Sequence, residues 1–173
     1  KHLLKRMQGY QLSKEQQEAA HNLLAKLFKA PNEGQIDWQA QAVKDALERQ
    51  VSIISGGPGT GKTYTVARLL VALQAVNETS LTMVMAAPTG KAKQRLVESI
   101  NSAKGQLLQQ GIGKELINSI PHTAQTLHGL LGLRPNSHSA KYHSANPLPI
   151  DLLLVDEVSM VDLPMMARLL DAL

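Results

Sequence analysis

Residues 56–63 read Gly-Gly-Pro-Gly-Thr-Gly-Lys-Thr, and this stretch decides the fold class of the chain. It matches the P-loop pattern G-x-x-x-x-G-K-[ST], in which glycines let backbone N–H groups close around a phosphate without Cβ clashes. The Lys62 ammonium supplies a full positive charge to the β- and γ-phosphates, and the Thr63 hydroxyl can ligate Mg²⁺. The predicted phosphate-binding residues are Gly57, Gly59, Thr60, Gly61, Lys62 and Thr63. A glycine-rich turn without a ligand is the competing interpretation.

The flanks of this motif have the composition that a P-loop requires. Residues 51–55, Val-Ser-Ile-Ile-Ser, are short and β-branched and predict a buried strand, whereas residues 62–76 predict a helix. The amino end of that helix adds about half a positive charge beside the glycines.

Strands and helices alternate along the rest of the chain. Residues 81–87 and 152–155 are apolar and predict two further strands. Strands that are apolar on both faces, with helices between them, predict an α/β fold: a mostly parallel sheet flanked by helices. Because such sheets usually carry more than three strands, we expect a domain truncated at its C-terminus. The predicted helices span residues 13–30, 38–49, 62–76, 90–102, 126–131 and 162–170, and residues 134–149 predict a loop or weak hairpin.

A boundary is predicted near residue 34. Ser13 and Gln16 have the spacing of a capping box and start a helix that Pro31 and Gly34 would end. We therefore expect residues 1–34 to form a helical segment, the tail of an N-terminal region, ahead of a domain over residues 35–173.

An acidic pair follows the last predicted strand. Asp156 and Glu157 stand at the carboxyl end of residues 152–155, the Walker B position of a P-loop enzyme. Asp156 would hold Mg²⁺ through water, and Glu157 would orient or deprotonate an attacking water. An exposed acidic pair without a function is the alternative.

Composition excludes several classes of protein. The 173 residues are 43% hydrophobic and 18% charged, which predicts a folded domain with a real core. The absence of cysteine excludes disulfides and thiol nucleophiles, and no apolar run is long enough for a transmembrane helix. We expect a cytoplasmic protein that does not use a membrane. A net charge of +4 permits a nucleic-acid partner without requiring one.

Three further sequence blocks, together with the P-loop, resemble a known protein family. Residues 87–92 read Ala-Pro-Thr-Gly-Lys-Ala, residues 126–128 read Thr-Leu-His, and residues 155–162 read Val-Asp-Glu-Val-Ser-Met-Val-Asp. With the P-loop, they make residues 35–173 resemble the superfamily 1 DNA helicases. The narrower resemblance is to the RecD (alpha) subunits of RecBCD-type exodeoxyribonuclease V.

This resemblance implies the first RecA-like motor domain of an ATP-dependent 5′-to-3′ DNA helicase. It implies ATP and Mg²⁺ as cofactors, single-stranded DNA and RecB-like and RecC-like subunits as partners, and a role in double-strand break repair and recombination. The family's second motor domain, with its arginine finger, would lie beyond Leu173. This fragment alone is therefore expected to hydrolyse ATP weakly or not at all.

The resemblance also implies roles for single residues. Gln39 would read adenine, with Gln41 as a nearby competitor. The block at residues 87–92 and the Thr-Leu-His element would contact or approach DNA; their candidate residues are Pro88, Thr89, Lys91, Thr126 and His128. Helix caps and solvated side chains are the competing interpretation for these positions.

Other classes of function stay open. An AAA+-type remodelling ATPase could carry the same P-loop, and a non-enzymatic subunit could bind ATP only to hold a complex together. A nucleoside kinase fits less well, because an acidic pair suits water activation better than a phosphate acceptor. Turnover of ATP with and without single-stranded DNA discriminates among these functions.

Overall fold

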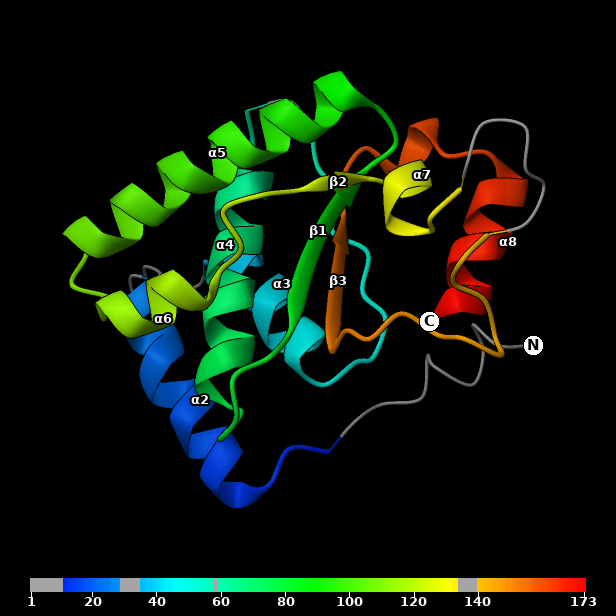
Figure 1. Cartoon of the computed structure of the whole chain (residues 1–173). Helices are drawn as coiled ribbons and strands as arrows, with labels where there is room; N and C mark the ends of the chain where they lie inside the picture. The colour runs from blue at the N-terminus through cyan, green and yellow to red at the C-terminus, as the bar shows by residue number, and fades with distance from the viewer. Residues whose placement is uncertain (1–10, 29–34, 58, 134–139) are drawn as a thin grey trace. The chain divides into compact units, whose positions relative to one another are not determined.

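Polar side chains cap several of the helices in the computed structural model, which describes residues 11–28, 35–57, 59–133 and 140–173 (Figure 1). Helix α2 (Lys14–Leu27) begins with the predicted capping box between Ser13 and Gln16. The Asp37 carboxylate caps α3 (Trp38–Leu47), and the Asp162 carboxylate accepts the Met165 N–H at 2.7 Å at the start of α8 (Leu163–Ala172). Each cap satisfies a backbone donor that the helix itself leaves unpaired.

The chain divides into two units. The first comprises Lys1–Ser80 and Ile100–Ile120, and the second comprises Leu81–Ser99 and Pro121–Leu173. The first unit includes α2, α3, α4 (Lys62–Ala75) and α6 (Lys114–Ser119). The second includes β1 (Met83–Ala87), β2 (Gln125–Thr126), α7 (Leu127–Leu130), β3 (Leu152–Val155), the 3₁₀ turn η1 (Val158–Met160) and α8. Helix α5 (Gly90–Gln109) contributes residues to both units.

Helix α4 is the centre of the first unit. It contacts α2, α3 and α6. The Gln16 side-chain amide also donates to the Val76 carbonyl at 3.0 Å and ties the start of α2 to the end of α4. Apolar side chains from these helices are buried, among them Leu27, Val43, Leu70, Val71 and Ile117. The helix that follows the glycine loop is thus held on several sides by apolar packing.

The second unit is built on a parallel sheet with the order β2-β1-β3 (Figure 1). Met83 pairs with Leu152 and Ala86 with Val155, while Ala87 pairs with Thr126. Because all three strands are parallel, their carboxyl ends lie at one edge. The α/β class with a parallel sheet and flanking helices is therefore confirmed.

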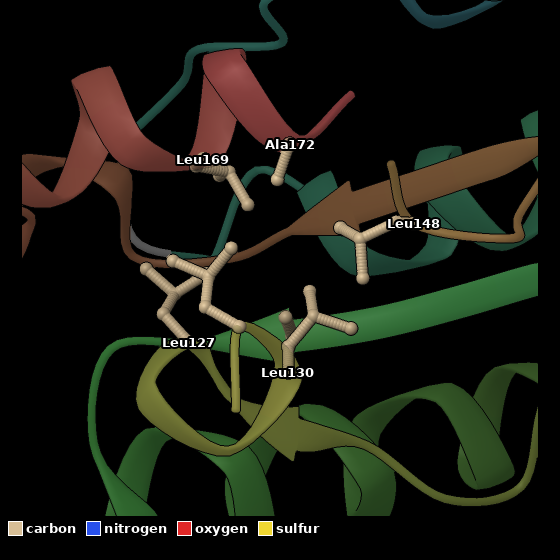
Figure 2. Close-up of a cluster of buried hydrophobic side chains, with 7 residues drawn as sticks. Leu127, Leu130, Leu148, Leu169 and Ala172 are labelled. Atoms are coloured by element: carbon tan, nitrogen blue, oxygen red, sulfur yellow. The ribbon is translucent and has the colours of Figure 1, made fainter. Parts of the chain in front are cut away.

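A cluster of apolar side chains holds α7 and α8 to this sheet (Figure 2). Leu127 and Leu130 of α7 point toward Leu169 and Ala172 of α8, and Leu148 completes the cluster (Figure 2). The backbone N–H of Leu148 also donates to the Ala172 carbonyl at 2.7 Å. The last helix is thus fixed both by apolar burial and by a backbone hydrogen bond.

The amino ends of β1 and β3 are joined by Asp151. Its carboxylate accepts the Thr82 N–H at 2.8 Å, and its own N–H donates to the Thr82 carbonyl at 3.0 Å. A charged acceptor makes the first bond stronger than a neutral one. Together the two bonds extend the pairing of β1 with β3 beyond the strands themselves.

The predicted buried strand at residues 51–55 is wrong. None of the described strands pairs with these residues, and Ile53 is 92% exposed. A strand exists only where a neighbour bonds its N–H and C=O groups. The β-branched composition indicated that the backbone is extended but not whether a partner strand is present. The third strand of the sheet is β2, which the sequence had predicted only as the start of a helix.

Other differences concern where elements end. The helix predicted over residues 90–102 continues to Gln109, the helix predicted to residue 30 ends at Leu27, and the last helix reaches Ala172. Thr126, predicted as helical, is instead the end of β2 and the cap of α7. Residues 106–121, to which the sequence assigns no definite element, contain the end of α5 and the whole of α6. The boundary at residue 34 stays a prediction, since residues 29–34 lie outside the described part.

In the part of the chain that the structure describes, no helix combines the length and apolar character needed to cross a bilayer.

Replacement of Asp151 by alanine is expected to lower the free energy of unfolding by about 1–2 kcal/mol, because the Thr82 N–H loses a charged acceptor. Urea titration of the full chain, followed by circular dichroism, measures this change. Asp151→Asn keeps an acceptor oxygen and should recover most of the loss, while Glu98→Ala, at an exposed site on α5, should stay within about 0.5 kcal/mol of the wild type. Equal stability of the two Asp151 variants would contradict the role given to the side chain.

Candidate functional site

The glycine loop has the backbone conformation that its sequence predicts. Gly59 and Gly61 have φ angles of 75° and 79°, in the left-handed region that favours glycine. The turn is closed by Thr60, whose hydroxyl donates to the Gly57 carbonyl at 2.8 Å. Successive N–H groups in such a turn form a concave surface suited to anions.

Lys62 folds back over this loop. Its ammonium donates to the Gly56 carbonyl at 2.5 Å, and its side chain is exposed. A Cβ atom at position 56 would lie 2.7 Å from the Thr60 hydroxyl oxygen, so any larger residue there would have to displace the Thr60 side chain. The positive charge is thus held at the loop that would take the phosphates.

The amino end of α4 is anchored just beyond the loop. The buried Thr65 bonds the Gly61 carbonyl twice, through its N–H at 2.9 Å and through its hydroxyl at 3.1 Å. The N–H groups of the first helical turn have no partner within a helix and can face an anion. Thr63, half-buried in this turn, presents a hydroxyl of the kind that binds Mg²⁺.

Gln39, rather than Gln41, contacts the loop. The Gln39 side-chain nitrogen donates to the Thr60 carbonyl at 2.9 Å, and its oxygen accepts from Arg68 Nη1 at 3.2 Å. The Gln41 side chain instead donates to the Asp45 carboxylate at 2.7 Å, along the surface of α3. Of the two glutamines, Gln39 is therefore the one that contacts the loop, and its role as the adenine-reading residue stays a prediction.

Arg68 contacts this site through Gln39 and is not among the residues predicted from the sequence. It lies on α4 four residues after Tyr64, so both side chains share one face of the helix. Its guanidinium carbon lies 4.1 Å from the centre of the Tyr64 ring. An arginine one turn after an aromatic residue on the P-loop helix was the available signal.

The acidic pair lies directly after β3. The Asp156 N–H donates to the Ala86 carbonyl at 3.0 Å and so continues the ladder with β1, whereas the Glu157 N–H donates to the Asp156 carboxylate at 2.9 Å. Among the described residues, Glu157 is the one non-glycine with a positive φ, at 52°. This left-handed conformation costs an L-residue about 1–2 kcal/mol. Strain of this kind clusters at functional positions.

The remaining predicted residues gather at the same edge of the sheet in the second unit. Pro88 and Thr89 follow β1, Thr126 ends β2, and Asp156 follows β3. The Thr89 hydroxyl accepts the Ala92 N–H at 3.1 Å, and the Thr126 hydroxyl accepts the Gly129 N–H at 3.2 Å. Both hydroxyls therefore act as helix caps, as the competing interpretation held. The exposed Lys91 and His128 side chains add cationic or polar groups beside these caps.

The predicted site residues thus form two groups. The glycine loop and Gln39 belong to the first unit, while the acidic pair and the predicted DNA contacts belong to the second. Within the described residues, no group of three or more His, Asp or Glu side chains could hold a metal by itself. Thr63 in the first unit and Asp156 in the second each carry an oxygen of the kind that Mg²⁺ binds.

Comparisons with known proteins identify the family of the chain. A family model described as an AAA domain matches residues 39–173. The chain is similar to RecBCD enzyme subunit RecD of Haemophilus influenzae, with 49% identity over 154 residues, covering 88% of this chain and 24% of the relative. The RecD subunit of Mycolicibacterium smegmatis is 48% identical over 139 residues, 78% of this chain and 24% of the relative.

A more distant relative is the ATP-dependent RecD2 DNA helicase of Deinococcus radiodurans, 31% identical over 83% of this chain and 17% of the relative. The chain spans about a quarter of the length of the RecD subunits it matches. A match to this family implies use of a nucleotide together with a metal ion.

Gly61→Ala is expected to lower the free energy of unfolding by about 1–3 kcal/mol, because an L-residue is strained at that φ. The added Cβ would also lie 2.9 Å from the Gln39 side-chain nitrogen. Gly105→Ala is the matched control: its Cβ would meet nothing within 4 Å, and alanine should stabilise α5 by about 0.5–1 kcal/mol. Thermal melting of both variants measures the contrast, and a similar shift in both would contradict the loop geometry.

Proposed function

Since this chain belongs to the AAA domain family and within it to the RecD type, we propose that it is the first motor domain of an ATP-dependent DNA helicase. The observation that carries the proposal is the glycine loop with the Lys62 ammonium held across it. A loop of this form binds the phosphates of a nucleotide. The similarity to RecD subunits supports a nucleotide motor that acts on DNA.

The phosphates of ATP bind to the loop amides and the first turn of α4. Lys62 leaves the Gly56 carbonyl and neutralises the β- and γ-phosphates, while Gly57, Gly59, Thr60 and Gly61 supply backbone contacts. Thr63 and Asp156 would hold Mg²⁺, which supplies charge neutralisation for the phosphates. Glu157 orients the attacking water and takes its proton, a role consistent with its strained and exposed position at the strand end.

Gln39 selects the base. A side-chain amide can accept a hydrogen bond from the amino group of adenine and donate one to N7, which gives a preference for ATP. The contact between Gln39 and the Thr60 carbonyl supports this role, because it fixes the amide beside the phosphate loop.

DNA binds along the strand edge of the second unit through its backbone. The Lys91 ammonium offers charge, and the N–H groups that begin α5 offer donors for a phosphate. Pro88 and Thr89 shape that turn, while Thr126 and His128 lie at the neighbouring strand end. The capping role of the two threonine hydroxyls positions the helix amides, so a threonine can contribute to DNA binding without releasing its cap.

The wider role proposed for the protein is based on its similarity to RecD subunits. The protein would act with RecB-like and RecC-like subunits in an exodeoxyribonuclease V of the cytoplasm, in double-strand break repair and recombination. Movement along single-stranded DNA in the 5′-to-3′ direction would require a second motor domain that closes on the nucleotide.

Lys62→Ala is expected to abolish DNA-stimulated ATP turnover of the full-length protein, because the transferred phosphate loses its principal positive charge. Phosphate release with and without single-stranded DNA measures the effect. Lys44→Ala, which removes an exposed lysine of α3, is the control and should keep full turnover. Normal turnover in Lys62→Ala would refute the site, and turnover of the unaltered protein that ignores DNA would favour a remodelling ATPase.

Lys91→Ala is expected to weaken binding of single-stranded oligonucleotides without regard to sequence. Loss of one phosphate contact should make the slope of log affinity against log salt shallower by about 0.7. Fluorescence anisotropy at several salt concentrations measures both quantities. Lys114→Ala, an exposed lysine at the start of α6, should retain the wild-type slope; equal slopes for Lys91→Ala and the wild type would exclude a phosphate contact at Lys91.

A further inference from the structure

Arg68 occupies an unusual place for a charged side chain. Its guanidinium carbon lies 4.3 Å from the centre of the Phe28 ring and 4.1 Å from the centre of the Tyr64 ring. Phe28 is the buried C-cap residue that follows α2, and Tyr64 belongs to the first turn of α4. A planar cation that contacts two aromatic rings gains cation–π energy from both and loses freedom to rotate.

The guanidinium has one described hydrogen bond, from Nη1 to the Gln39 side-chain oxygen at 3.2 Å. Within the described residues, its buried Nε has no hydrogen-bond partner. The position of the group therefore depends on the two rings and on Gln39. Among the described residues, the guanidinium makes no ion pair with a carboxylate.

Arg68 fixes which way the Gln39 amide faces. An arginine only donates hydrogen bonds, so the atom facing it must be the amide oxygen. The Thr60 carbonyl only accepts, so the atom facing it at 2.9 Å must be the amide nitrogen. The backbone of Gln39 is fixed as well, because its N–H donates to the Asp37 carboxylate at 2.9 Å.

We infer that Arg68 is a positioning residue that sets the base selectivity of the nucleotide site by orienting the Gln39 amide. The inference rests on the proposed function, in which Gln39 reads adenine. Oxygen and nitrogen of the amide each keep one further bonding position, which can pair with the amino group and N7 of adenine. Guanine presents acceptors at both O6 and N7, so an amide held in this orientation offers its oxygen to the wrong group.

Arg68→Met tests this role, since methionine can fill the space between the rings but cannot donate to Gln39. We expect the preference for ATP over GTP to fall about tenfold, the loss typical of one charged hydrogen bond. Calorimetric titration of the full-length protein with ATP, GTP and inorganic tripolyphosphate measures it. Tripolyphosphate has no base, so its affinity should stay within about twofold, as the phosphate loop is unchanged. Arg49→Met, an exposed arginine of the first unit, is the matched control.

A second variant tests the same role if Arg68→Met fails to fold. Phe28→Leu removes one ring but leaves Arg68 its donor, and it should shift the ATP preference in the same direction by a smaller factor. Combining Arg68→Met with Gln39→Ala gives a further readout, because a residue that acts through Gln39 should have no additional effect once Gln39 is absent.

The inference is overturned by an unchanged ATP-to-GTP ratio in Arg68→Met or by the absence of any such preference in the unaltered protein. It is also overturned if tripolyphosphate affinity falls in step with ATP affinity, or if the effect persists in the Gln39→Ala background. The failure of the proposed function is distinct: tripolyphosphate would then bind Lys62→Ala as well as the unaltered protein.

Discussion

The parallel hydrogen-bond ladder between β1 and β3 is the interaction on which the second unit depends. It aligns Ala86 with Val155, and the ladder continues one residue further through the Asp156 N–H. Because the strands run the same way, the turn into α5 and the acidic pair emerge at one edge. The apolar cluster between α7 and α8 packs these helices against β1 through Ala86. The chemistry predicted for Asp156 and Glu157 is thus placed by backbone pairing, since their own side chains make few contacts.

In the first unit the corresponding constraint is the start of α4. Glycines at 59 and 61 allow the chain to turn sharply into the helix, and Thr65 fastens the first turn to the Gly61 carbonyl. Three helices pack against α4, so the turn cannot relax by moving the helix away. The result is a rigid helix end with a lysine over it, which is the arrangement that a phosphate-binding loop needs before its ligand arrives.

The sequence correctly predicted features that depend only on neighbouring residues. The glycine loop, the capping box at Ser13 and the cap at Asp162 follow from a few neighbouring residues, and all three are present. Residues 51–55 were predicted wrongly because strand formation depends on a partner that may come from anywhere in a chain. The extension of α5 to Gln109 depends on the packing of buried residues such as Leu107. The pattern of neighbouring residues does not predict such packing. Arg68 and the strained backbone of Glu157 depend on contacts and torsions that no motif records.

The bond between Asp151 and Thr82 has a consequence for variation in this family. A slip of β3 by a single residue would carry the acidic pair about 3.3 Å along the sheet and exchange its two faces. The carboxylate that opposes such a slip lies just before the amino end of β3, outside the four sequence blocks that carry the helicase resemblance. Inherited changes at that position could therefore abolish the proposed motor activity while leaving the residues of all these blocks intact, and a search restricted to the blocks would overlook them.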